Sequence, residues 1–308
     1  MASDNEGPRL NRVIWILASL SGMLLGLRLF SKLWRRRLLW WDDYVLIAAW
    51  SALVVSTSLQ SAATTYGLGK HYVDMDPESN LHVAILSYSA GFAAILSTIW
   101  SKTAFAMSLL RISSEGGGGD GWVVRTSLWG IIVMVNLTLG VNATLQWVQC
   151  WPVQKLWHHD MPGACLPFAT IQNYNTFAAA YSGAMDIVLA LLPWKIIWTV
   201  AVNKREKVGA LLAMSMGVFA GTMAFLKIRT LYTIGNDNTT TVDLFIFGTA
   251  EPATAIMAAS IPMLRALIQL EPRSRPPRLI ELSDNCGALT VKDKNAFLSR
   301  EVSHSEEV

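Results

Sequence analysis

Long apolar stretches separated by short polar segments follow one another along almost the whole chain. Seven are long enough for helices that cross a bilayer, because about 20 apolar residues span ~30 Å of hydrocarbon. They are Val13–Phe30, Tyr44–Thr65, Val83–Leu110, Trp122–Trp147, Asn173–Val200, Gly209–Ile234 and Leu244–Leu270. The pattern predicts an all-α membrane protein: a seven-transmembrane-helix bundle over residues 13–270, an N-terminal segment of residues 1–12 and a tail of residues 271–308.

The composition supports a chain whose solvent is lipid. Hydrophobic residues make up 52% and charged residues 15% of the chain, and its mean hydropathy is +0.36. A soluble domain carries about 25% charged residues, so these values exclude a soluble, disordered or small secreted protein. A net charge of +3 does not indicate nucleic-acid binding, because the cations lie in short blocks beside the apolar stretches. The expected partner is the bilayer of the plasma membrane or an endomembrane, crossed several times.

Lys and Arg are unevenly divided between the two alternating sets of loops. One set holds Arg28, Lys32, Arg35, Arg36, Arg37, Arg111, Arg125, Lys195, Lys204, Arg205, Lys207, Arg265, Arg273, Arg275 and Arg278, and the other holds Arg9, Arg12, Lys70 and Lys155. Cytoplasmic loops keep the positive excess. The N-terminus is therefore predicted to be extracellular, and the tail, which contains Pro, Arg and Ser, to be cytosolic and disordered.

Two features fit the predicted outer side. Asn238-Thr239-Thr240 is a glycosylation acceptor, and Cys150 and Cys165 lie in the largest outer loop. In an oxidising compartment these cysteines form a disulfide, although two free thiols remain an alternative. The histidine group of His71, His82, His158 and His159 is interpreted as solvated loop residues, so no metal site is predicted.

Four charged residues lie at least seven residues from the nearest end of a predicted span. They are Lys102, Asp186, Lys227 and Glu251. A charge near the bilayer centre costs at least ~2.5 kcal/mol and is normally paired or placed against a cavity. Internal pairing is one interpretation, with Lys227 and Glu251 at comparable depths. The other is a site that binds a ligand or transfers a proton.

The predicted depths of Lys102 and Asp186 in the membrane suggest different roles for these two residues. Lys102 lies in the cytoplasmic third of its span, where Asp42 and Asp43 at the mouth of the second span are within reach of its long side chain. Asp186 has no opposite charge at its predicted depth, and Ser182 lies one turn before it. Asp186 is therefore the first candidate for a ligand-binding or acidic group.

The sequence lacks the motifs of several common kinds of enzyme and cofactor site. The predicted seventh span contains no Lys, so a retinal Schiff base of the usual kind has no anchor there. The chain contains no His-Glu-x-x-His, Gly-x-Ser-x-Gly, Cys-x-x-Cys or Gly-x-Gly-x-x-Gly motif. No cofactor is predicted.

An ordered series of motifs covers residues 10–270. It comprises Asp42-Asp43-Tyr44, Tyr66-Gly67-x-Gly69-x-His71, Lys102, Leu110-Arg111-Ile112, Cys150-x-Pro152-x4-Trp157, Cys165, Asp186, Leu192-Pro193, Glu251 and Ile261-Pro262. In this order the chain resembles the fungal integral-membrane rhodopsin domain family. Ser260 departs from the pattern, since a Cys is expected before the Ile261-Pro262 turn.

The resemblance carries expectations about structure and function. The family resembles seven-helix receptors and includes proteins regarded as plasma-membrane sensors and proteins of satratoxin-type secondary-metabolite gene clusters. Retinal binding does not follow from its name. The resemblance supports the Cys150–Cys165 bond. It also marks as family-pattern positions Asp42, Asp43, Gly67, Gly69, His71, Lys102, Arg111, Asp186 and Glu251.

Three functional hypotheses are compatible with these residues, and the sequence leaves open whether the chain is an enzyme. The first is a membrane protein linked to a secondary-metabolite gene cluster. It would bind or sense a lipophilic small molecule through Lys102, Ser182, Asp186, Lys227 and Glu251. The second, ranked close behind, is an intramembrane cyclase or isomerase of a prenylated or polyketide intermediate, with Asp186 or Glu251 as the acid. The third is an exporter, for which no symmetry between halves is visible. The sequence leaves the oligomeric state open.

Overall fold

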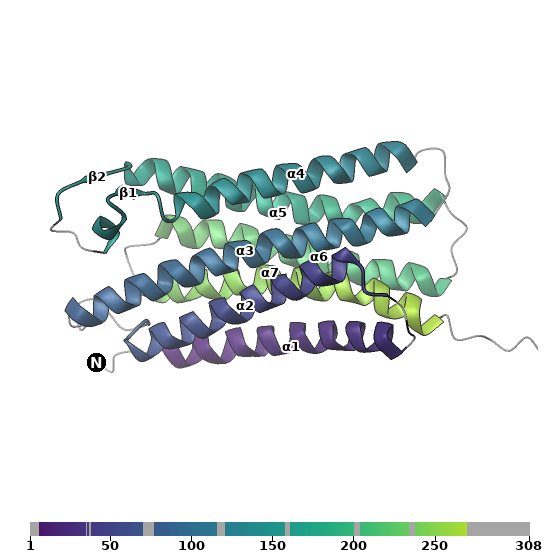
Figure 1. The fold of residues 1–308 in the computed structure, drawn as a ribbon, viewed down its shortest axis with the longest axis horizontal. Helices are drawn as coiled ribbons and strands as arrows, with labels where there is room; N and C mark the ends of the chain where they lie inside the picture. The colour runs from purple at the N-terminus through teal and green to yellow at the C-terminus, as the bar shows by residue number, and fades with distance from the viewer. Residues whose placement is uncertain are drawn as a thin grey trace, which may run out of the picture. The chain divides into compact units, whose positions relative to one another are not determined.

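Seven long α-helices make up most of the part of the protein that the structure describes. The computed structural model describes residues 6–34, 36, 38–69, 77–115, 121–157, 161–199, 204–233 and 238–269. The helices are α1 (Gly7–Trp34), α2 (Trp41–Thr65), α3 (Pro77–Glu115), α4 (Gly121–Leu145), α5 (Phe168–Thr199), α6 (Lys204–Thr233) and α7 (Asn238–Gln269). Between α4 and α5 lie the strands β1 (Cys150–Trp151) and β2 (Ala164–Cys165) and the 3₁₀ helix η2 (Val153–Leu156). The helices run side by side, and the strands lie beyond the ends of α4 and α5 (Figure 1).

Each predicted span corresponds to one helix, which confirms the seven-helix fold. Most helices extend beyond the apolar stretch that marks them: α1 begins at Gly7 instead of Val13, and α3 has 39 residues. At 1.5 Å per residue α3 is about 58 Å long, well beyond the hydrocarbon thickness. Among the described residues, all helices except α6 are long and apolar enough to cross a membrane, which makes six candidate spans. The predicted tail of residues 271–308 lies outside the described residues.

Helix α7 occupies the centre of the bundle. It packs against α1, α2, α3 and α6, and every residue from Gly248 to Ser260 is buried. This run is rich in Ala, Ser and Thr, whose small side chains let neighbouring helices approach closely. A polar group on this part of α7 therefore meets partners from several helices.

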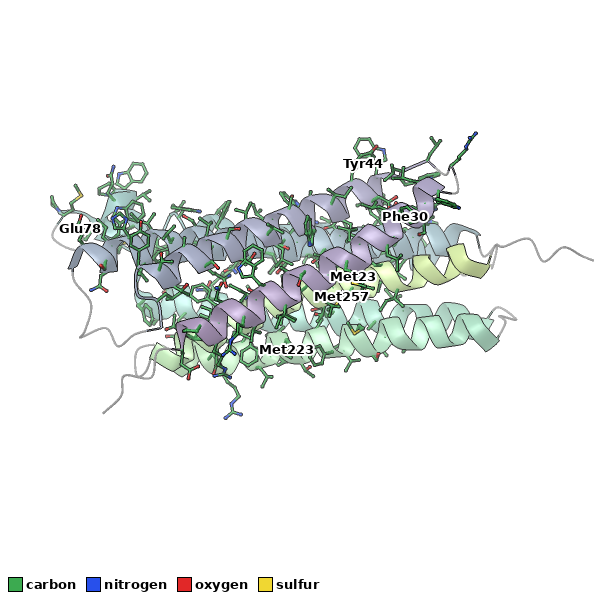
Figure 2. The ribbon with its side chains drawn as sticks, turned by 90° about the horizontal axis from the view of Figure 1, so that it is seen from below. Met23, Phe30, Tyr44, Glu78, Met223 and Met257 are labelled. Atoms are coloured by element: carbon green, nitrogen blue, oxygen red, sulfur yellow. A yellow bond between two sulfur atoms is a disulfide. The ribbon has the colours of Figure 1, made fainter. Side chains whose placement is uncertain are left out.

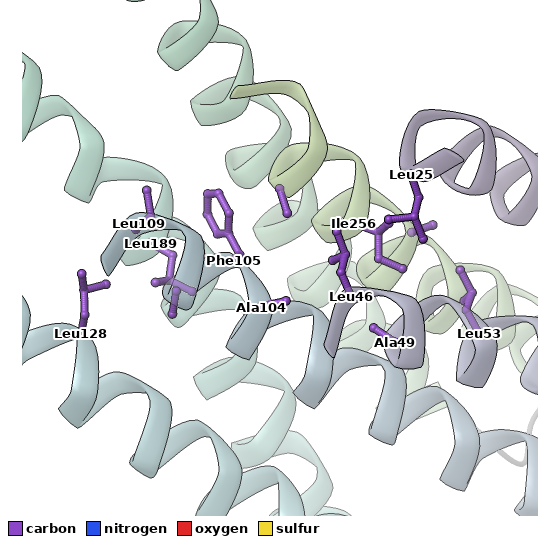
Figure 3. Packing of buried hydrophobic residues seen from close by; sticks show 13 residues of the cluster. Leu25, Leu46, Ala49, Leu53, Ala104, Phe105, Leu109, Leu128, Leu189 and Ile256 are labelled. Atoms are coloured by element: carbon purple, nitrogen blue, oxygen red, sulfur yellow. The ribbon is translucent and has the colours of Figure 1, made fainter. Parts of the chain in front are cut away.

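Apolar side chains fill one half of the bundle. This half contains the C-terminal parts of α1, α3 and α7. Leu46 and Leu53 of α2, Phe105 of α3, Leu189 of α5 and Ile256 of α7 belong to this cluster (Figure 3). Each of the five is at most 6% exposed. Their close packing makes this half of the bundle a continuous core.

The outward faces carry large apolar side chains. On α1, Met23 is 69% exposed and Phe30 is 59% exposed (Figure 2). Such surfaces are unfavourable in water and favourable against lipid tails. The exposure pattern agrees with an integral membrane protein that crosses the bilayer several times.

Glycines permit the close contact between α5 and α6. A Cβ added at Gly217 would lie 2.6 Å from the Cβ of Ala190, and one at Gly221 would lie 3.1 Å from the carbonyl oxygen of Gly183. The spacing of Gly217 and Gly221 places them on one face of α6. This small-residue pair therefore packs helices within the bundle.

Candidate functional site

Three ionisable side chains from three helices meet inside the bundle. Nζ of Lys102 on α3 lies 2.5 Å from Oδ1 of Asp186 on α5 and 3.3 Å from Oε1 of Glu251 on α7. The three residues are buried, with exposed fractions of 2%, 5% and 1%. Glu251 lies 13 residues into α7, about 20 Å from the first residue of that helix. The ion pairs offset part of the cost of burying these charges and join α3, α5 and α7.

Ser182 and Lys227 extend this group. The hydroxyl of Ser182 donates a 2.5 Å hydrogen bond to Oε1 of Glu251, and its carbonyl oxygen accepts one of 3.2 Å from Lys102. Nζ of Lys227 on α6 lies 4.0 Å from Oε2 of Glu251. We call Lys102, Ser182, Asp186, Lys227 and Glu251 the central cluster.

The central cluster contains all five residues that the sequence suggested for ligand binding. The expected pairing of Lys227 with Glu251 is confirmed at the long distance of 4.0 Å. The expectation that Asp186 has no opposite charge at its depth is wrong, because Lys102 is its partner. The sequence gives the depth of the Lys102 backbone in the membrane. The long side chain of Lys102, however, carries its ammonium to the level of Asp186.

A second ionic cluster is buried at the other side of the apolar core. Arg28 of α1 binds Oδ2 of Asp42 through Nη2 at 2.6 Å and Oδ1 of Asp43 through Nε at 3.0 Å. Nζ of Lys32 lies 2.5 Å from Oδ2 of Asp43. The predicted contact of Lys102 with these aspartates is wrong, because α1 supplies both of their cations. We call Arg28, Lys32, Asp42 and Asp43 the Arg28 cluster.

The Arg28 cluster also reaches α3 and α7. Nη1 of Arg28 donates to the carbonyl oxygen of Ala259 at 2.6 Å, and Nη2 lies 3.5 Å from the hydroxyl of Ser108. Arg28 is fully buried. The guanidinium therefore ties four helices together, in keeping with its fixed array of five donors.

A cavity of about 390 Å³ lies beside the central cluster. It is lined by residues of α2 to α7, and Ser182, Lys227 and Glu251 form its inner end. Phe168, at the start of α5, lines it 14 residues before Ser182, a distance of about 21 Å along the helix. Asp186 is not among the described residues that line the cavity. The volume falls in the range of ~300–1,000 Å³ that is typical of small-molecule sites.

Amide side chains interrupt the apolar wall of the cavity. They are Gln60, Asn142, Gln146, Gln172 and Asn175, with Gln149 in the turn that follows α4. Gln146 and Gln172 donate to the backbone carbonyl oxygens of Tyr88 and Leu231 at 3.2 Å and 3.1 Å. Oδ1 of Asn142 is buried and has no hydrogen-bond partner among the described residues. Sequence reasoning missed these amides, although most are polar interruptions within two or three turns of the predicted outer ends of the spans.

The remaining family-pattern positions lie apart from the cavity. Gly67 and Gly69, in the turn after α2, have φ angles of +113° and +98°. A Cβ at Gly69 would lie 2.7 Å from the backbone nitrogen of Gly7, so the turn packs directly on the start of α1. The guanidinium carbon of Arg111 lies 4.5 Å from the ring centre of Trp40. His71 lies outside the described residues.

The predicted disulfide is present and pairs the two strands. Cys150 and Cys165 are bonded and lie opposite each other in the antiparallel β1–β2 pair. Asn238 is the first residue of α7, and its glycosylation stays a prediction. The ring of His82 stacks on Tyr66, with 4.9 Å between ring centres, whereas residues 158–160 lie outside the described residues.

Comparison with known proteins gives one match. The family model of the fungal rhodopsin domain matches residues 27–270, which covers most of the chain and both ionic clusters. No curated protein and no solved structure gives a significant match.

Proposed function

Because the chain belongs to the fungal rhodopsin domain family of multi-pass membrane proteins, we propose that it binds and senses a lipophilic small molecule. The observation that carries this proposal is the cavity of about 390 Å³ that ends on the central cluster. Its wall is mainly apolar with a few amides, the composition expected for an apolar ligand with polar substituents. Such a molecule is concentrated in the bilayer.

The central cluster provides the means of sensing. It joins α3, α5, α6 and α7, so a ligand that contacts Lys227 or Glu251 has different interactions in different arrangements of these helices. A ligand with such differential affinity shifts the population towards the arrangement it binds better. The charge bias of the loops supports an outer location for the cavity, with the Arg28 cluster on the cytosolic side.

The resemblance to proteins of satratoxin-type gene clusters supports a particular origin for the ligand. The proposed ligand is an intermediate or product of a secondary-metabolite pathway encoded beside this gene. Deletion of the gene and profiling of the metabolites test this origin. Loss of a whole product set supports sensing, and an unchanged profile contradicts the link to the pathway.

Direct binding tests the cavity itself. Tritiated anthracene is a rigid apolar probe small enough for it, and saturation binding is measured on the full chain in lipid nanodiscs, with empty nanodiscs subtracted. Gly248 lines the cavity, and among the described residues, apart from its own stretch of helix, the one atom within 4 Å of a Cβ added there is Nζ of Lys227. Gly248→Leu is therefore expected to fill the inner end and weaken binding at least about tenfold, the cost of losing roughly 1.4 kcal/mol.

Gly130→Leu is the matched control. A Cβ at Gly130 meets nothing within 4 Å, and this exposed residue of α4 does not line the cavity. The control should bind anthracene as the unmodified protein does. Absence of saturable binding to the unmodified protein, or equal binding by both leucine variants, would contradict the proposal.

The structure favours one of the two candidate acids of the enzyme hypothesis. Of the two candidate acids, Glu251 lines the cavity, whereas Asp186 is held beneath it by Lys102. An acid-catalysed cyclase would therefore use Glu251, with Ser182 as its hydrogen-bond partner. Accumulation of the same single unrearranged precursor in a deletion strain and a Glu251→Gln strain would favour the enzyme over the sensor.

A further inference from the structure

We infer that the ligand is an electrically neutral oxygenated molecule, and that one of its carbonyl or hydroxyl oxygens accepts a hydrogen bond from Lys227. The inference rests on the proposed function and narrows the ligand class. It combines the position of one ammonium group, the charge balance of the central cluster and the space beside Gly248.

The two lysines of the central cluster differ in how they are held. Nζ of Lys102 has carboxylate oxygens at 2.5 Å and 3.3 Å, and its side chain is 1% exposed. Nζ of Lys227 has its carboxylate partner at 4.0 Å, and its side chain is 25% exposed. Because N–H···O bonds have lengths of ~2.7–3.2 Å, the contact of Lys227 with Glu251 is an ion pair without a hydrogen bond. The ammonium of Lys227 therefore retains donors at the cavity wall.

The charge balance argues against a charged ligand. The central cluster holds two lysines and two carboxylates, so its formal charge is zero. A ligand carboxylate would add an uncompensated negative charge at the level of the membrane interior, and a ligand amine would add a positive one. Both are costly in a medium of low dielectric constant. A neutral oxygen satisfies the donor of Lys227 without changing the net charge.

The space for this oxygen lies beside α7. A Cβ built on Gly248 lies 4.0 Å from Nζ of Lys227, and outside its own stretch of α7 no other atom of the described residues lies within 4 Å of it. Pro252, one turn later, has no N–H to donate to the carbonyl oxygen of Gly248. A ligand oxygen in the gap between this point and Nζ of Lys227 can come within hydrogen-bond distance of the ammonium, and a ligand hydroxyl there can also donate to the carbonyl oxygen of Gly248. A second hydroxyl further along the cavity satisfies Oδ1 of Asn142, which has no partner among the described residues.

Competition against tritiated anthracene tests the inference on the full chain in nanodiscs. The competitors are anthracene, 9-acetylanthracene and anthracene-9-carboxylate, which share one ring system and carry no substituent, a neutral carbonyl and an anion. The neutral ketone should compete about tenfold more strongly than anthracene, as expected for a hydrogen bond to a charged donor. The carboxylate should compete more weakly than the ketone.

Variants at Lys227 identify the donor. Lys227→Met should abolish the difference between the ketone and anthracene, whereas Lys227→Arg, which keeps a cationic donor, should preserve it. Should the methionine variant fail to fold, Gly248→Ala gives an independent test, because its methyl group narrows the gap between α7 and Nζ of Lys227 in which the ligand oxygen is placed. This variant should reduce the advantage of the ketone.

Each outcome separates the inference from the proposed function. If anthracene binds saturably but the ketone has no advantage, or keeps it in Lys227→Met, the inference is overturned and the cavity remains a ligand site. If the carboxylate competes most strongly, the ligand class is anionic and the inference is equally overturned. If anthracene has no saturable site, the proposed function itself fails.

Discussion

Replacement of Lys102 by methionine should destabilise the bundle by about 3 kcal/mol. The change removes one 2.5 Å contact to Asp186, one of 3.3 Å to Glu251 and one of 3.2 Å to the carbonyl oxygen of Ser182. Polar contacts between membrane helices are worth ~0.6 kcal/mol on average and ~1.7 kcal/mol at most, so three give roughly 2–5 kcal/mol. Breaking a buried ion pair from one side costs ~3–5 kcal/mol by comparison. Methionine preserves the unbranched shape, so packing changes little.

A second substitution distinguishes lost charge from lost packing. Oδ2 of Asp186 has no hydrogen-bond partner among the described residues, so without Lys102 the whole carboxylate is uncompensated. Asp186→Asn in the Lys102→Met background removes that charge, and the double variant should be more stable than Lys102→Met alone. Asp186→Asn by itself should cost less than Lys102→Met, because Lys102 keeps Glu251 at 3.3 Å.

The measurement is the free energy of unfolding in mixed micelles of a mild detergent and dodecyl sulfate, followed by tryptophan fluorescence. The four proteins form a double-mutant cycle. Independent substitutions add within ~0.5 kcal/mol, whereas a shared ion pair gives a larger interaction energy. Additive effects of the two substitutions would refute the assignment of Lys102 and Asp186 as mutual partners.

Three further substitutions or treatments test other parts of the fold by the same unfolding measurement. Arg28→Met should lose about 3–5 kcal/mol, because Asp42, Asp43 and the carbonyl oxygen of Ala259 each lose a contact with Arg28, although Lys32 still binds Asp43; a neutral effect would contradict the buried network. Gly69→Ala should lose at least ~1 kcal/mol, because φ is +98° and the added Cβ meets Gly7, whereas Gly130→Ala should be neutral or gain up to ~1 kcal/mol. Reduction of Cys150–Cys165, which closes a separation of 15 residues, should cost about 3 kcal/mol and be visible as a mobility shift on non-reducing gels.

The helices of this protein could be predicted from sequence because hydrocarbon imposes a strong and local requirement. Each of seven apolar stretches became one helix, although the ends differ by up to six residues, as at Gly7 and Pro77. Apolar length reports the part of a helix that lies in hydrocarbon, whereas the backbone continues as helix through the interface with polar side chains outward. The ends of α1 and α3 therefore required the structure.

The members of the central cluster and the pair of Lys227 with Glu251 could also be predicted, but the pairing of Lys102 with Asp186 could not. A buried charge is visible as an exception in an apolar stretch, which is how Asp186 and Glu251 were found. Its partner depends on helix rotation, on which helices are neighbours and on the reach of long side chains. Arg28 illustrates the limit: it lies at the end of the first apolar stretch and was counted with the loop cations, yet it is fully buried against Asp42 and Asp43.

Helix α7 gives the proposed sensing a physical route. Glu251, at the inner end of the cavity, and Ala259, whose carbonyl oxygen accepts from Arg28 at 2.6 Å, lie eight residues apart on the same helix. They are separated by about 12 Å of continuous buried helix. An α-helix packed on all sides moves as a unit, so displacement of Glu251 by a ligand also displaces the acceptor of Arg28. Most side chains from Gly248 to Ser260 are small and let the neighbouring helices approach closely, which favours movement of α7 as a whole over local repacking.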